Sequence, residues 1–216
     1  MSKNQLEKFK TQFLEHLEVE KNRSRLTLRN YDLYLKRFIE FARKRGISSP
    51  EGVDLDLVRS FRLWLNRSTD AHGKPLKLQT QTYHVIALRS FLKYLARRDV
   101  KTLAAEKIEL PKTPSRQVSF LESSDLEKLF EATMQEKDEL RKLRARAILE
   151  LLVSTGLRVA EAANLERKQV NLKKDEFSVR GKGDKIRVVF LSASAKQALK
   201  NYLDKRADNS QALFAR

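Results

Sequence analysis

EFSVRGKGDKIRVVF, residues 176–190, is the stretch that decides the fold of the second half of the chain. Apolar residues alternate with polar ones at Phe177 and Val179, and at Ile186, Val188 and Phe190. A period of two is typical of β-strands, and the glycine-rich segment between the two runs can form a tight turn. The stretch therefore predicts a β-hairpin.

Outward from the hairpin, apolar residues recur every three to four positions, which predicts amphipathic helices. One helix is expected to end at Gly156, and another to follow the hairpin over residues 193–205. In the first hundred residues, Ser24 and Asp54 are placed to cap two of four short helices. Four such helices with brief connections predict a small bundle. We expect them over residues 4–20, 25–46, 55–65 and about 80–98.

The helical period is interrupted at LPKTPS, residues 110–115, where two prolines lie three positions apart. Proline has no backbone N–H and a fixed φ, so this segment is typical of an extended linker. We expect three parts: a helical domain over residues 1–104, a linker over 105–119 and a second domain over 120–216.

The chain is strongly basic, with 45 lysines and arginines against 28 acidic residues and a net charge of +17. The excess is spread over both halves, at +10 for residues 1–110 and +7 for residues 111–216. Two cationic folded units indicate a polyanionic partner, with nucleic acid the first choice and surface charge for solubility the alternative.

Several classes of protein are excluded or disfavoured by composition. The absence of cysteine excludes disulfides, thiol catalysis and cysteine-ligated zinc. No apolar run approaches the roughly 20 residues that span a bilayer, and the charged N-terminus lacks the apolar core of a signal peptide. We expect a cytoplasmic protein without a membrane partner.

TGLRVAE, residues 155–161, ends one helix and begins another, which fixes Arg158 at a backbone corner. A guanidinium suits a phosphodiester because its planar fork donates two parallel hydrogen bonds and keeps its charge. The alternative is a surface arginine paired with Glu161. Lys182, between two glycines at the hairpin tip, could bring a proton donor close to a backbone, or be an ordinary turn lysine.

These stretches together resemble the tyrosine site-specific recombinases of the phage-integrase and Xer type. TGLRVAEAANL followed by VRGKGDKIRVVFLS is similar to the family patterns TGLRxSE and GKGxKxRxVPL. RSRLTLRNYDLYLKRFIEFARKRG resembles the core-binding domain, and LPKTPSRQVSFLESSDLEKLF the interdomain junction. Ala160 and Phe190 replace the usual serine and proline.

The resemblance implies a mainly α fold with a small β-hairpin. A four-helix, SAM-like core-binding domain would precede the N-terminal part of the α+β catalytic domain. It also implies strand cleavage and rejoining through a 3′-phosphotyrosyl link, without metal or other cofactor. Arg158 would stabilise charge on the scissile phosphate, Lys182 would protonate the departing 5′-oxygen, and Glu161 would orient Arg158.

Double-stranded DNA is the partner that the resemblance implies, held between two basic domains, with self-association into tetramers on DNA and a place in the nucleoid. Arg89, Lys93 and Arg97 form a cationic stripe, and Thr27 and Arg29 begin the second helix. We expect these five residues to contact DNA; the alternative is a solvated charged face.

The His-x-x-Arg motif and the nucleophilic tyrosine of the family have no counterpart in these 216 residues. We therefore expect a C-terminally truncated recombinase that binds duplex DNA without cleaving it. Two alternatives stay open: a recombinase-derived DNA-binding module or regulator, and a basic RNA- or ribosome-binding protein.

Overall fold

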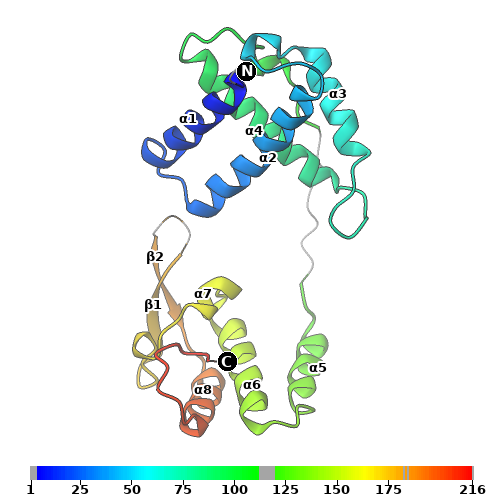
Figure 1. Ribbon diagram of the computed structural model, residues 1–216. Helices are drawn as coiled ribbons and strands as arrows, with labels where there is room; N and C mark the ends of the chain where they lie inside the picture. The colour runs from blue at the N-terminus through cyan, green and yellow to red at the C-terminus, as the bar shows by residue number, and fades with distance from the viewer. Residues whose placement is uncertain (1–3, 112–119, 182, 184, 216) are drawn as a thin grey trace. The chain divides into compact units, whose positions relative to one another are not determined.

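A computed structural model describes residues 4–111, 120–181, 183 and 185–215 (Figure 1). The chain divides into two compact units, residues 1–116 and 117–216, each with its own hydrophobic core. Within the described residues the fold is mainly helical with a single β-hairpin, so the expected balance of secondary structure is confirmed.

Four helices form unit 1, and polar side chains cap the first three of them. Ser24 Oγ accepts a hydrogen bond from Thr27 N at 3.3 Å, and Asp54 Oδ1 accepts one from Leu57 N at 2.8 Å, so both predicted caps are confirmed. The helices are α1 (Gln5–Val19), α2 (Arg25–Arg43), α3 (Leu55–Asn66) and α4 (Leu78–Ala96), with 3-10 turns η1 (Pro50–Gly52) and η2 (Ala105–Lys107).

The core of unit 1 is rich in aromatic side chains. Phe13 of α1 is buried, and its ring lies 5.8 Å from Tyr31 of α2 and 5.6 and 5.3 Å from Phe91 and Tyr94 of α4. Tilted and edge-on ring pairs of this kind add stability beyond the area that they bury. These contacts hold α2 and α4 together, which matters because both helices carry candidate DNA contacts.

His84 is a polar side chain enclosed in this core, with only 2% of its surface exposed. Its Nδ1–H donates to Thr80 O at 2.9 Å, and its ring packs 4.5 Å from Tyr34 and 6.4 Å from Phe61. Its Nε2 atom has no hydrogen-bond partner among the described residues. Burial lowers the pKa of His84 below its ordinary value of 6.5, because the charged imidazolium would be poorly solvated there.

Helices also dominate unit 2, where α6 and α8 pack on each other. Gly156 ends α6 in the left-handed conformation, with φ of 60°, as the sequence predicts. The elements are α5 (Ser123–Thr133), α6 (Glu139–Thr155), α7 (Val159–Ala163), the 3-10 turn η3 (Arg167–Gln169), β1 (Glu176–Arg180), β2 (Ile186–Phe190) and α8 (Ala193–Lys205).

The two strands pair antiparallel, with Phe177 opposite Val189 and Val179 opposite Arg187. The predicted hairpin is confirmed, but the alternating apolar residues of its second strand do not face the core. Phe177, Val179 and Val189 are buried, whereas Ile186, Val188 and Phe190 are exposed. The face of β2 that meets the core therefore carries Val189 and Arg187.

A buried arginine ties the last described residues to unit 2. The side chain of Arg206 is fully buried, and its Nη1 donates to the carbonyls of Ala212 and Leu213 at 2.9 and 2.7 Å. Its Nε and Nη2 donate to Asp208 at 2.8 and 2.6 Å. Leu213 is buried, and its N donates to Leu165 O at 2.7 Å. Arg206 therefore satisfies carbonyls that would otherwise be buried without partners.

His84 makes the stability of unit 1 depend on pH. Because the fold lowers the His84 pKa, the unfolded state binds more protons below pH 6.5, and the free energy of unfolding decreases as pH falls through that value. We expect His84→Phe to weaken this dependence. The fluorescence of Trp64, the single tryptophan, during urea unfolding measures it. His72→Gln, at an exposed position, serves as control and should retain the wild-type slope.

Arg206→Met should destabilise unit 2 by about 2 kcal/mol, because the carbonyls of Ala212 and Leu213 lose their donor, whereas Asp208 is half-exposed and keeps Ser210 N. Hydrogen exchange of the α8 amides at increasing urea concentrations measures this loss. The neighbouring exposed residue supplies the control variant, Lys205→Met, which should be near neutral. Equal effects of the two substitutions would contradict a structural role for the Arg206 contacts.

Candidate functional site

The first candidate site lies where α6 turns into α7. Gly156 reverses the chain, Leu157 is buried, and Arg158 is the N-cap residue of α7. Two-thirds of the Arg158 side chain is exposed (66%), so the guanidinium faces solvent from a backbone that packing fixes on both sides. Because its backbone is fixed and its guanidinium is exposed, Arg158 can bind an anionic ligand.

Glu161 contacts Arg158 twice. Its Oε2 accepts from the Arg158 backbone N at 2.9 Å, which satisfies a free N–H at the start of α7, and its Oε1 accepts from Arg158 Nη1 at 3.0 Å. The structure thus brings the two predicted residues together. A surface arginine that merely pairs with Glu161 would make the same contact. The contact therefore does not distinguish that role from phosphodiester binding by Arg158.

Arg187 is a third member of the cluster that the sequence analysis did not single out. Its Nη2 donates to Glu161 Oε2 at 2.7 Å and its Nη1 to Oε1 at 3.1 Å. The signal was available in the hairpin: a register that places Val179 inward also places its partner Arg187 inward.

These donors hold the pKa of the Glu161 carboxyl at about 2, well below 4.5, chiefly through the hydrogen bonds from Arg187 and then through the Arg158 N–H. A lowered carboxyl pKa means that the cluster contributes its stability above pH 4.5. That contribution is lost only as pH falls toward 2. At neutral pH the carboxylate is therefore fully ionised.

Gly181 follows β1 and leaves room for the guanidinium of Arg187, which lies on β2. A Cβ atom at this position would lie 2.8 Å from Arg187 Nη1 and 3.3 Å from Glu161 Oε1, so the Arg187 guanidinium would have to move to make room for it. Gly181 N donates to Lys185 O at 2.8 Å across the turn. Lys182, the predicted proton donor, lies outside the described residues.

A second candidate site follows α2 and α4 of unit 1. Arg29, Lys93 and Arg97 are exposed, and Thr27 and Arg89 are half-buried. Thr27 Oγ1 lies 2.9 Å from Ser24 Oγ, and Arg89 Nε donates to Ala105 O at 3.2 Å. Lys93 Nζ is 4.0 Å from Glu106 in an exposed pair of little energetic consequence.

Three hollows adjoin one another along α4, with volumes of about 380, 230 and 450 Å³. Thr27 and Ile86 line the first, Ile86 also lines the second, and Ser90 and Lys93 line both the second and the third. Their shared residues make one continuous surface, and four of the five predicted DNA contacts lie on it. Arg29 lines none of the three hollows.

The third hollow brings in cations that the sequence analysis did not select. Lys21, Arg23 and Arg98 line it together with Lys93 and Arg97. They come from the end of α1, the α1–α2 connection and the end of α4, so only tertiary packing places them side by side. The run EKNRSR, residues 20–25, was the available sequence signal.

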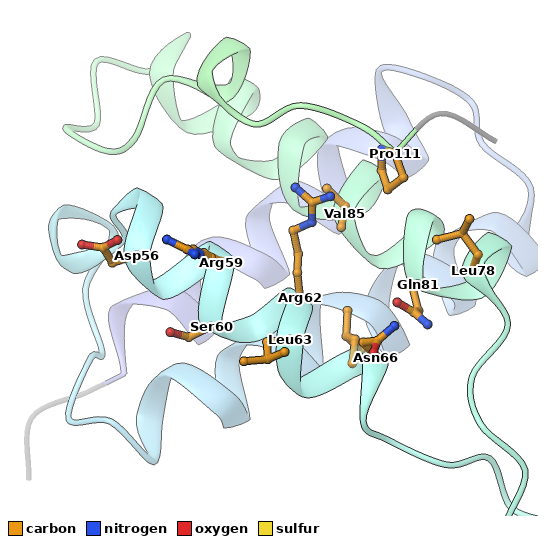
Figure 2. A pocket seen from close by; sticks show the side chains of 11 residues that line it. Asp56, Arg59, Ser60, Arg62, Leu63, Asn66, Leu78, Gln81, Val85 and Pro111 are labelled. Atoms are coloured by element: carbon orange, nitrogen blue, oxygen red, sulfur yellow. The ribbon is translucent and has the colours of Figure 1, made fainter.

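A larger cavity of about 740 Å³ opens on α3 and α4, away from the predicted contacts (Figure 2). Leu63, Leu78 and Val85 give it an apolar lining, while Arg59 and Arg62 are its cations. Arg62 Nη1 donates to Glu109 O at 3.3 Å, so part of this arginine serves the structure. Asp56, Ser60, Asn66 and Gln81 complete the polar lining of the cavity.

Comparison with known sequences decides the family. Residues 119–216 match the phage integrase family, and residues 11–99 match the phage integrase N-terminal SAM-like domain. The two matches do not overlap, and together they cover most of the chain. The chain belongs to the phage integrase family. The SAM-like assignment and the Xer-type resemblance are thereby confirmed.

Tyrosine recombinase XerC of Bacillus pumilus (strain SAFR-032) is a relative of this phage integrase family member. It is 37% identical over 193 residues, which are 89% of this chain and 61% of that protein. XerC of Bacillus subtilis (strain 168) is 35% identical, with the same coverage. The chain thus spans about three-fifths of the length of these relatives.

Solved structures of recombinases share the fold. XerH site-specific recombinase bound to palindromic difH substrate aligns with a TM-score of 0.66 and 24% identity over 96% of this chain and 61% of that one. A lambda integrase tetramer bound to a Holliday junction aligns with a TM-score of 0.66 and 17% identity, over 93% and 56% of the two chains. These likenesses support the mixed helical and hairpin fold.

Among the residues that the structure describes, no group of three or more histidine and acidic side chains could hold a metal ion, and no helix is long and apolar enough to cross a membrane.

Proposed function

We propose that this chain acts in site-specific DNA recombination, with unit 1 binding duplex DNA and Arg158 binding the scissile phosphate. The observation that carries the proposal is the Arg158–Glu161–Arg187 cluster, in which an exposed guanidinium is held at the start of α7 in a chain of the phage integrase family. In this proposal the domains are residues 1–104 and 120–216, joined by a linker over 105–119.

The α4 surface supplies the affinity for DNA. Thr27, Arg29, Arg89, Lys93 and Arg97 contact the phosphate backbone, and the cations around the third hollow extend the same face. Lysine and arginine displace counterions condensed on the phosphates, which makes binding strong and dependent on salt. Contacts of this kind position the protein on duplex DNA without reading its sequence.

The chemistry of the whole protein is transesterification at phosphorus. A tyrosine hydroxyl attacks the scissile phosphate, a bond from phosphorus to the tyrosine oxygen forms, and the bond to the 5′-oxygen breaks. Arg158 stabilises charge on the non-bridging oxygens, and Lys182 protonates the departing oxygen. In this proposal Arg158 supplies the positive charge and Lys182 the proton, so the reaction uses no metal or other cofactor.

The 216-residue chain binds DNA without cleaving it in this proposal, because none of its tyrosines suits the role of nucleophile. Tyr202, the one tyrosine in unit 2, is 1% exposed, and its hydroxyl accepts a hydrogen bond from Ala215 N at 3.3 Å. Self-association on DNA, as in the lambda integrase tetramer, and a place in the cytoplasmic nucleoid belong to the same proposal.

DNA binding should depend on the α2 and α4 cations. We expect a variant with Arg29, Lys93 and Arg97 all changed to Gln to bind duplex DNA more weakly. Its slope of log K against log salt should be smaller by about 3, because each lost phosphate contact removes about 1. Fluorescence anisotropy of a labelled duplex at several salt concentrations measures both changes.

The control for this experiment removes three exposed lysines elsewhere in unit 1, at positions 8, 44 and 101. Its net charge equals that of the test variant, so it should retain most of the affinity and slope of the wild-type chain. If the two variants lose affinity equally, binding follows net charge alone and the proposed face is wrong.

Cleavage is tested separately with a nicked duplex that traps covalent intermediates. Incubation of the 216-residue chain with this DNA, followed by denaturing electrophoresis, should give no protein–DNA adduct. An adduct would contradict the proposal that these residues lack a nucleophile. A DNA-binding module without a catalytic role would also show salt-dependent binding and no adduct. A response of Arg158 to a phosphodiester favours the recombinase proposal over such a module.

A further inference from the structure

Arg187 makes the stronger of the two side-chain attachments to Glu161. Its guanidinium donates two hydrogen bonds, at 2.7 and 3.1 Å, one to each carboxylate oxygen. The Arg158 side chain donates one, at 3.0 Å. The exposed fractions follow the same order, with 10% for the Glu161 side chain, 37% for Arg187 and 66% for Arg158. Solvent competes least with the bonds between Arg187 and Glu161.

Arg158 also reaches both carboxylate oxygens, through its backbone N–H at 2.9 Å and Nη1 at 3.0 Å. The less exposed Arg187 adds a fork of two parallel hydrogen bonds from one guanidinium, which fixes the plane of the carboxylate. Once Arg187 has fixed that plane, Glu161 Oε1 lies where Arg158 Nη1 donates, and Oε2 lies where the Arg158 N–H donates. The direction of the exposed Arg158 guanidinium therefore depends on Arg187, although no hydrogen bond between the two arginines is present among the described contacts.

Arg187 also belongs to the hairpin whose turn carries Lys182. The missing Cβ of Gly181 leaves room for the Arg187 guanidinium, so the end of β1 lies directly against the Glu161 cluster. The same guanidinium thus contacts the N-terminus of α7 through Glu161 and the base of the hairpin turn. Movement of either element would break a contact with the other.

We propose that Arg187 is a positioning residue that orients Arg158 toward a phosphodiester through Glu161, and that it fixes the hairpin against the same site. The proposal rests on the proposed function of Arg158. It differs from a simple structural ion pair in one respect. Loss of Arg187 should change how Arg158 holds a phosphate even where unit 2 remains folded.

The test follows the Arg158 Nε–Hε signal of the 216-residue chain by NMR during a titration with dimethyl phosphate. This probe is a phosphodiester monoanion without the rest of DNA, so the cations of unit 1 contribute little to the signal. We expect a saturable shift in the wild-type chain. Arg187→Gln should weaken the affinity about fivefold, a coupling typical of residues in one hydrogen-bonded network.

Arg187→Lys keeps the charge beside Glu161 but loses the fork, so it should fold and remain weakened. Lys185→Gln removes one charge from the same hairpin at an exposed position and should bind as the wild-type chain does. If Arg187 acts through Glu161, the double variant Glu161→Gln, Arg187→Gln should be no weaker than the weaker of the two single variants.

Wild-type affinity in both Arg187 variants would overturn the proposal. A wild-type chain without any Arg158 response would instead contradict phosphate binding by Arg158. Positioning is then still judged from the rotation of the Arg158 guanidinium, measured by exchange between its Nη protons without ligand. Slow rotation in the wild-type chain and faster rotation in Arg187→Lys supports positioning, while equal rates refute it.

Discussion

The carboxylate of Glu161 accepts four hydrogen bonds, two from Arg158 and two from Arg187, and the geometry of the second unit around its candidate site depends on them. Three charges gathered at a half-exposed corner would cost stability if any donor or acceptor lacked a partner. Here each carboxylate oxygen accepts two hydrogen bonds. The cluster joins a helix start, a strand and, through the space left at Gly181, a turn.

Unit 1 exposes many cations on its surface while a hydrophobic core keeps it folded. Its aromatic core, centred on Phe13, holds α2 and α4 together while their outer faces carry arginine and lysine. Six cations of unit 1 line the continuous surface along α4, namely Lys21, Arg23, Arg89, Lys93, Arg97 and Arg98. Packing in the core sets the distances between the cations, and a surface of closely spaced cations suits a polyanionic partner.

The helices, the hairpin and Arg158 could be predicted because each leaves a local periodic or turn signal. Arg187 was missed because its inward position follows from the strand register, and Val188 and Val189 are adjacent, so the sequence pattern alone leaves open which of them faces the core. A shift of one residue reverses the face of every side chain in a strand. Lys21, Arg23 and Arg98 were missed for another reason: they meet only after α1 and α4 pack. Periodicity identifies elements, whereas sites shared between elements require tertiary structure.

The reversed face of β2 also affects how the protein behaves in solution. Ile186, Val188 and Phe190 form an exposed apolar stripe on a strand of a two-stranded sheet, where another strand can pair. Salts such as sulfate strengthen apolar association, whereas any added salt screens contacts between cations and phosphates. A sulfate buffer that releases this protein from nucleic acid will therefore also favour association through the apolar stripe, whereas chloride screens the same contacts with phosphate without that added effect.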